Sequence, residues 1–216
     1  MVRILQLILA SFLISMPALC QNPSVVLRGK TFKLSWWDEF SGPAVDSTRW
    51  DFRRDSKNLS TQLARNNFQE NGILRQFLRK ESANGKSYTA GGLISEDTLH
   101  YGYYEAKIKT PPKKGWHSGF WLMKQDGTGG TGVAKASLEI DILENESENI
   151  NSFTCLHRKY NPVTNFGTKT FNTSALSSGF IKVGCLYEQD SIIYYYDGKQ
   201  VDKRYVGNLT TGKMNI

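Results

Sequence analysis

The sequence predicts an all-β domain, either a sandwich or a barrel, on three observations. Side chains alternate in polarity along short segments, turn dipeptides such as Asn-Gly and Asp-Gly separate these segments, and no stretch of ten residues carries a helical stripe of apolar side chains. Alternation with a period of two places successive side chains on opposite faces of a strand. Short turns favour antiparallel neighbours, so we expect antiparallel sheets around one core.

Three segments, taken in chain order, are predicted to form strands. Residues 73–80 read as a strand that follows Asn71-Gly72, a dipeptide that tolerates the positive φ angles of a tight turn. Residues 101–109 alternate between a polar and aromatic set and a set of small, aromatic and aliphatic side chains, as a half-buried strand does. Residues 191–202 contain two strand-like runs around Asp197-Gly198, which predicts a hairpin.

Composition excludes several classes of protein. The chain has 216 residues, of which 39% are hydrophobic and 12% aromatic, so it can bury one sizeable core and is not disordered. Three cysteines are too few for a disulfide-rich scaffold. The net charge is +7, but the 27 Lys and Arg residues form no run longer than two, which argues against nucleic-acid binding.

The N-terminus is typical of a secretion signal. Arg3 supplies a positive start, an apolar run follows from Ile4, and this run is too short to span a bilayer of roughly 30 Å. We expect a signal peptide over residues 1–20, a short linker over 21–30, and a secreted (extracellular or periplasmic) protein. The bulky Leu19 makes lipid attachment at Cys20 the less favoured alternative.

Removal of the signal peptide leaves two cysteines, Cys155 and Cys185, each in a strand-like run. In an oxidising compartment they can form a disulfide if neighbouring strands bring their Cα atoms within about 4.4–6.8 Å. The alternative is that both are small buried apolar residues. The sequence leaves both interpretations open.

The candidate catalytic residues are three acidic residues on one predicted strand. Glu139 and Asp141 are two residues apart and share a face of a strand, whereas Ile140 and Ile142 point to the opposite face. Glu144 has the wrong parity for a regular strand. A bulge at Ile142-Leu143 would insert one extra residue and return Glu144 to the acidic face.

Two glutamates in this arrangement suit glycoside hydrolysis. Their side chains, leaning towards each other, would bring the carboxyl groups to about 5–5.5 Å, the separation of retaining enzymes. A metal site is the competing functional interpretation, but the strand contains no histidine and Glu-x-Asp alone is weak evidence for a hard cation, so we expect no metal at the site. A solvated acidic edge is the third interpretation, and the interleaved aliphatic residues argue against it.

Residues 139–144 resemble the E-x-D-x-x-E signature of glycoside hydrolase family 16, in the bulged form of its laminarinase, agarase and carrageenase branches. The similarity extends roughly from residue 36 to residue 200. The further matching segments are residues 36–42 with Trp50 (W-x-D-E-F), residues 101–109 (Y-G-x-x-E-A-R), residues 115–123 (G-x-W-P-A-F-W-L), His157, and residues 196–198 (Y-x-D-G).

The resemblance implies a fold and a set of roles. The fold is a jelly-roll β-sandwich, concanavalin A-like, with two curved antiparallel sheets and an open cleft. Glu139 would be the nucleophile and Glu144 the general acid and base, while Asp141 would orient Glu139. The resemblance further implies sugar contacts from Trp116, Trp121 and His157, each with a purely structural role as the alternative.

The implied activity is that of a secreted, retaining endo-glycosidase that needs no cofactor. The bulged signature favours β-1,3-glucan as the polysaccharide substrate, with galactans such as agar or carrageenan second. A non-catalytic glycan-binding protein or a transglycosylase on the same fold are the alternatives. We expect a monomer, and although many members hold a structural calcium, the sequence identifies no ligands for one.

Two departures from the family pattern bear on these expectations. His117, Ser118 and Gly119 stand where the family has Pro-Ala, so the nearby sugar subsites would differ. The sequence reaches Ile216 before the last strands of the family's sandwich, so we expect the domain over residues 31–216 to lack its C-terminal strands.

Overall fold

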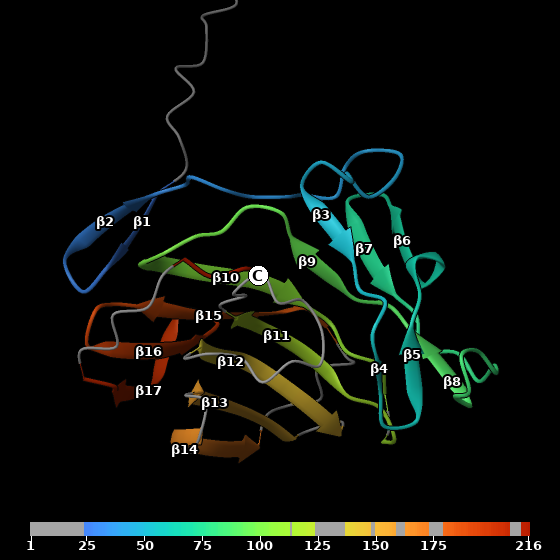
Figure 1. Cartoon of the computed structure of the whole chain (residues 1–216). Coiled ribbons are helices and arrows are strands. Elements are labelled where there is room, and N and C mark those ends of the chain that lie inside the picture. The colour runs from blue at the N-terminus through green and yellow to red at the C-terminus, as the bar shows by residue number, and fades with distance from the viewer. Residues whose placement is uncertain are drawn as a thin grey trace, which may run out of the picture. The chain divides into compact units, whose positions relative to one another are not determined.

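Two four-stranded antiparallel sheets contain the long strands of the chain (Figure 1). The structure is a computed structural model that describes residues 24–112, 114–123, 137–147, 150–158, 163–172, 179–207 and 213–216. One sheet has the order β10 (Gly102–Ile108), β15 (Ile181–Tyr187), β16 (Ser191–Tyr196), β17 (Lys199–Tyr205). The other has the order β11 (Ser118–Met123), β12 (Ser137–Ser147), β13 (Ile150–Arg158), β14 (Val163–Asn172). The predicted all-β class is confirmed.

The chain divides into two units, Met1–Trp37 and Asp38–Ile216. In the first, β1 (Ser24–Leu27) and β2 (Lys30–Lys33) form a hairpin whose turn residues, Arg28 and Gly29, have φ angles of 54° and 76°. Among the described residues, the first strand starts at Ser24, inside the segment expected to be a linker. The expected signal peptide over residues 1–20 lies outside the described residues.

Shorter strands and one 3-10 helix precede the long strands of the second unit. They are β3 (Trp50–Phe52) paired with β9 (Leu93–Ser95), β4 (Ser56–Lys57) with β5 (Ser60–Gln62) and β8 (Tyr88–Ala90), β6 (Asn67–Glu70) with β7 (Ile73–Gln76), and the helix η1 (Ala64–Asn66). The pairs β3–β9 and β6–β7 are antiparallel, whereas β5 and β8 run parallel.

The core of the second unit is built from both large sheets. The Tyr196 hydroxyl donates a hydrogen bond to the Ile142 carbonyl at 3.4 Å and so joins β16 to β12. The burial of apolar side chains between the two sheets is the main source of stability of the sandwich. The buried members are Tyr104, Leu122, Leu138, Ile140, Ile142, Leu143, Val183, Cys185, Tyr187, Ile192, Tyr194, Tyr196, Val206 and Met214.

The hairpin predicted at Asp197-Gly198 is present, and the turn predicted at Asn71-Gly72 forms a second hairpin. The strand after that turn, β7, ends at Gln76 and not at Lys80 as predicted. Asn71 and Gly72, with φ angles of 52° and 71°, connect β6 to β7. Asp197 and Gly198, with φ angles of 46° and 75°, connect β16 to β17. Two consecutive left-handed residues match the twist of the flanking strands.

Gly184 allows close packing between β10 and β15. A Cβ atom there would lie 2.6 Å from the Tyr104 carbonyl oxygen and 2.7 Å from the Tyr103 hydroxyl. We expect Gly184→Ala to lower the free energy of unfolding by roughly 1–3 kcal/mol, because the backbone must move to relieve the overlap. Thermal melts would measure it against Gly102→Ala, where a Cβ meets no atom within 4 Å. Equal melting temperatures for the two variants would contradict this account.

Residues 214–216 pair with two segments of the second unit. Met214 exchanges backbone hydrogen bonds with Leu99 (2.7 and 2.8 Å), and Asn215 exchanges them with Met123 at the end of β11 (2.9 and 3.0 Å). The Asn215 side chain also donates to the Ser95 carbonyl at 2.7 Å. This short segment therefore connects the β9 region to β11.

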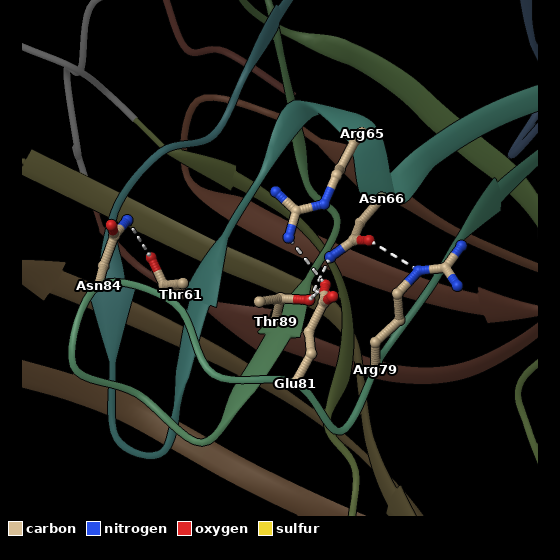
Figure 2. Close-up of polar contacts among 7 residues, drawn as sticks. All are labelled: Thr61, Arg65, Asn66, Arg79, Glu81, Asn84 and Thr89. Atoms are coloured by element: carbon tan, nitrogen blue, oxygen red, sulfur yellow. Dashed lines mark hydrogen bonds and ion pairs between the residues drawn. The ribbon is translucent and has the colours of Figure 1, made fainter.

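A polar cluster ties the segment after β7 to β8 (Figure 2). The fully buried Asn66 donates to the Thr89 hydroxyl at 2.8 Å and accepts from Arg79 Nε at 3.0 Å. Thr89 donates in turn to Glu81, which also accepts from Arg65 at 3.0 Å. The two buried members of the cluster, Asn66 and Thr89, both have hydrogen-bond partners, as buried polar groups in native proteins do, and these bonds hold the region together.

The cluster makes stability depend on pH. The hydrogen bond from Thr89, and secondarily the charge of Arg65, lower the pKa of Glu81 below its ordinary value of 4.5. A carboxyl group with a lowered pKa stabilises the folded state above that value, and the contribution is lost as the pH falls through the folded-state pKa. We expect Glu81→Gln to flatten the decline in melting temperature between about pH 5 and about pH 3. Glu70→Gln, on the exposed end of β6, is the control and should leave the decline unchanged.

Candidate functional site

A β-bulge interrupts strand β12. On the β11 side, Phe120 pairs with Leu143 and the next residue, Trp121, pairs with Asp141, so Ile142 is the extra residue. The β13 side shows the same irregularity between Asp141 and Glu144. The bulge that the parity of the acidic residues predicted at positions 142–143 is confirmed.

The bulge brings three carboxylates to one face of the sheet. Glu139, Asp141 and Glu144 lie opposite Met123, Trp121 and Gly119, which are two residues apart on β11 and therefore share a face. The intervening residues of β12 lie in the core, since Ile140, Ile142 and Leu143 are fully buried. In a regular strand Glu144 would have joined them.

The three carboxylates differ in exposure. Asp141, the middle one, retains only 6% of its surface, whereas Glu139 and Glu144 are half-buried. The burial of Asp141 suits a residue that orients its neighbours. The partial exposure of Glu139 and Glu144 suits residues that contact a substrate.

His117 contacts two acidic residues of β12. Its Nδ1 lies 3.2 Å from Oε1 of Glu146, and its Nε2 lies 3.8 Å from Oε1 of Glu144. The sequence alone assigns no role to His117. The departure from the Pro-Ala motif was the signal available, but the contact depends on the pairing register of β11 and β12, which one sequence does not reveal.

Trp121 contacts a positively charged side chain. The Arg53 guanidinium lies 5.5 Å from the centre of the Trp121 ring and donates two hydrogen bonds to Asp55, at 2.8 and 2.7 Å. Burial opposes ionisation of Asp55, but the hydrogen bonds and charge of Arg53 outweigh it, so the pKa of Asp55 lies below its ordinary value. Because Trp121 lies opposite Asp141, an aromatic ring and a cation adjoin the acidic face.

The structure gives less information on Trp116 and His157, the other two residues predicted to contact sugar. Trp116 lies half-buried in the loop before β11 and donates from its ring nitrogen to the Pro112 carbonyl at 3.3 Å. His157 lies on β13, paired in the register with Leu138, and its side chain is outside the described part of the structure. The sugar-binding roles of both residues stay predictions.

The two cysteines lie on different sheets. Cys155, on β13, pairs with Ile140. Cys185, on β15, pairs with Tyr104 and Tyr194 and is fully buried. They are therefore not on neighbouring strands of one sheet. The Cys155 side chain is outside the described part of the structure, so the disulfide stays a prediction.

The described residues contain neither a membrane-spanning helix nor a cluster of metal ligands. Within them, no helix is long and apolar enough to cross a membrane. The same part of the chain contains no group of three or more His, Cys, Asp or Glu side chains placed to hold a metal ion.

Comparison with known proteins identifies relatives over most of the chain. The model of the family described as Glycosyl hydrolases family 16 matches residues 46–213. Endo-1,3-1,4-beta-glycanase EglC of Rhizobium meliloti is 31% identical over 53% of this chain and 23% of its own length. Beta-porphyranase B of Zobellia galactanivorans is 28% identical over 71% of this chain and 52% of its own length.

Solved structures share the fold. The catalytic domain of an endo-1,3-beta-glucanase (laminarinase) from Thermotoga petrophila matches with a TM-score of 0.68 at 22% identity, over 80% of this chain and 77% of that one. The chain thus spans about half or less of the length of the two curated relatives, but most of this catalytic domain.

Proposed function

Because the chain belongs to glycosyl hydrolase family 16, we propose that it is a secreted endo-glycosidase that cleaves β-linked polysaccharide with retention of configuration. The single observation that carries this proposal is the bulge of β12, which places Glu139, Asp141 and Glu144 on one face. A pair of carboxylates on one side of a substrate is the arrangement that both steps of a retaining mechanism need.

The first step would use both glutamates. Glu139 attacks the anomeric carbon and forms a covalent glycosyl-enzyme, while Glu144 gives its proton to the leaving oxygen. In the second step Glu144, now ionised, takes a proton from water, and that water displaces Glu139. We expect a separation of about 5–5.5 Å between the two carboxyl groups.

Asp141 would act through its neighbour. Its position between the two glutamates and its 6% exposure suit a group that hydrogen-bonds Glu139 and fixes its orientation. Trp121, opposite Asp141, would offer a flat apolar surface to a sugar ring, and the Arg53 guanidinium, 5.5 Å from the centre of that ring, supplies a positive charge.

The substrate we propose is β-1,3-glucan, with galactans as the second choice. The names of similar proteins span both classes, a laminarinase and a porphyranase among them. The alternative is a protein that binds glycans without enzymatic activity. The presence of both Glu139 and Glu144 argues against this alternative. A transglycosylase would use the same residues with a sugar in place of water.

The proposal is tested by incubating the full chain with laminarin, lichenan, agar, porphyran and carrageenan and measuring new reducing ends. We expect release from one of these polysaccharides, with short oligosaccharides as the products of internal cleavage. Binding without release would favour the glycan-binding alternative. Longer oligosaccharides formed at high substrate concentration would indicate transglycosylation.

A further inference from the structure

One face of the hairpin formed by β6 and β7 is exposed. Gln69 and Leu74, which pair with each other, belong to the opposite face, where Gln69 is buried and its side-chain amide donates to the Gly42 carbonyl at 2.8 Å. Phe68 pairs with Arg75, so these two side chains share the exposed face. Phe68 retains 49% of its surface. The exposed face therefore presents an aromatic ring beside a guanidinium group.

The exposed face continues beyond the end of β7. The Phe77 amide donates to the Asn66 carbonyl at 2.8 Å, which extends the pairing of the hairpin by one residue. Phe77 is two residues after Arg75, so its side chain lies on the same face and diagonal to Phe68. Phe77 is 36% exposed. Two exposed phenyl rings therefore adjoin Arg75.

Arg79 is oriented by two contacts on the same side of the molecule. Its guanidinium carbon lies 4.6 Å from the centre of the Phe77 ring, and its Nε donates to the side-chain oxygen of the fully buried Asn66 at 3.0 Å. Nη1 and Nη2 form no hydrogen bond with a described residue, and Figure 2 shows them pointing away from the other labelled side chains. The neighbours thus hold the guanidinium in place while its terminal N–H groups stay available to a ligand.

The surrounding surface carries an excess of positive charge. Residues 61–85 contain four basic side chains and two acidic ones. One of the acidic side chains, Glu81, forms an ion pair with Arg65 at 3.0 Å. The exposed Arg75 and Lys80 form no ion pair with a described residue. This charge attracts an anionic ligand to the exposed face.

We propose that this face is a second glycan-binding site, which takes a sugar bearing a sulfate ester or a carboxylate. The terminal nitrogens of Arg79 form a planar fork that matches two oxygens of either anion. The rings of Phe68 and Phe77 supply apolar surface against which the C–H groups of the sugar pack. In Figure 1, β6 and β7 lie away from β12, which carries the three carboxylates. The inference goes beyond the proposed function, because binding at this face needs no cleavage.

Calorimetric titration of the full chain would test this site with α-linked ligands, which a cleft for β-linked polysaccharide does not take. The three probes are sulfated isomaltohexaose, an oligoguluronate hexasaccharide and neutral isomaltohexaose. We expect at least one anionic probe to bind about tenfold or more tightly than the neutral one, because the fork pairs with its charge. The sulfate and carboxylate arms identify which anion the site takes. Equal affinity for all three probes, or no binding of either anionic one, would overturn the proposal.

Two arginine variants separate a built site from general attraction to a basic protein. Arg79→Lys keeps the charge but loses the planar fork and its stacking on Phe77, so we expect the Kd of the anionic probe to rise about fivefold. Arg54→Gln is the matched control, since it removes an exposed positive charge next to β3, and it should change that Kd less than about twofold. An unchanged Kd in Arg79→Lys, or an equal rise in both variants, would show that the fork of Arg79 is not the binding group.

Because Arg79 also bonds to Asn66, Phe68→Ala provides a second variant outside the polar cluster. We expect it to raise the Kd of the anionic probe about threefold and to leave the melting temperature unchanged, since the Phe68 ring is exposed. Analytical ultracentrifugation tests a second copy of this chain as the occupant of the face. A dimer that Phe68→Ala separates would overturn the proposal. The titrations do not depend on activity, so failure of the polysaccharide panel and failure of this site are separate results.

Discussion

Replacing Glu139 with alanine should abolish turnover, with a fall in kcat of about 10⁴-fold or more on every substrate. The physical reason is that no covalent glycosyl-enzyme can form without the nucleophile. The cavity left by the side chain admits a small anion such as azide. With an aryl glycoside, azide should restore a slow reaction by attacking the anomeric carbon directly, which gives a glycosyl azide of inverted configuration.

The measurement is proton NMR of the anomeric product together with initial rates. Asp141→Asn is the graded comparison, because it keeps the shape of the nearly buried side chain and would weaken the hydrogen bond that we propose between Asp141 and Glu139. We expect a partial loss, smaller than that of Glu139→Ala. A glycosyl azide of retained configuration from Glu139→Ala would show that Glu139 is not the nucleophile.

Glu144→Ala should separate the two halves of the reaction. Polysaccharide cleavage is expected to fall by about 10²–10⁴-fold, because a sugar leaving group must be protonated. An activated aryl glycoside should still form the glycosyl-enzyme, which then accumulates because no base activates water. Azide needs no base, so it should release the intermediate as a product of retained configuration.

Intact-protein mass spectrometry would detect the accumulated intermediate, and peptide mapping would place it on Glu139. Glu188→Ala, in the turn between β15 and β16, is a matched removal of a carboxylate and should behave as the unsubstituted protein does. An inverted product from Glu144→Ala, or loss of the aryl glycoside and polysaccharide activities in equal measure, would refute the assignment of Glu144 as acid and base.

Local rules predicted much of the fold. Positive φ angles at Asn71-Gly72 and Asp197-Gly198 follow from residue type, and alternation along β10 follows from the period of a strand. The bulge of β12 could be predicted because a single misplaced acid among buried aliphatic residues has few other solutions. These features depend on neighbours in sequence.

Contacts between distant strands could not be predicted in the same way. The approach of His117 to Glu144, and of Arg53 to Trp121, requires the register between strands and the path of a loop. The same holds for the polar cluster around Asn66, whose partners are up to 23 residues away. Residue types alone allow many such pairings, and packing selects one.

The pairing of residues 214–216 has a consequence for the order of folding during synthesis. Asn215 hydrogen-bonds to Ser95 across 120 positions of sequence, and it also pairs with Met123, which lies opposite Glu139. A loop of that length closes late and at a substantial entropic cost. Until these residues are added, the backbone groups of Met123, at the end of β11 beside the acidic face, lack the partners that Asn215 supplies. An unpaired strand edge of this kind is a template for pairing with another chain during synthesis.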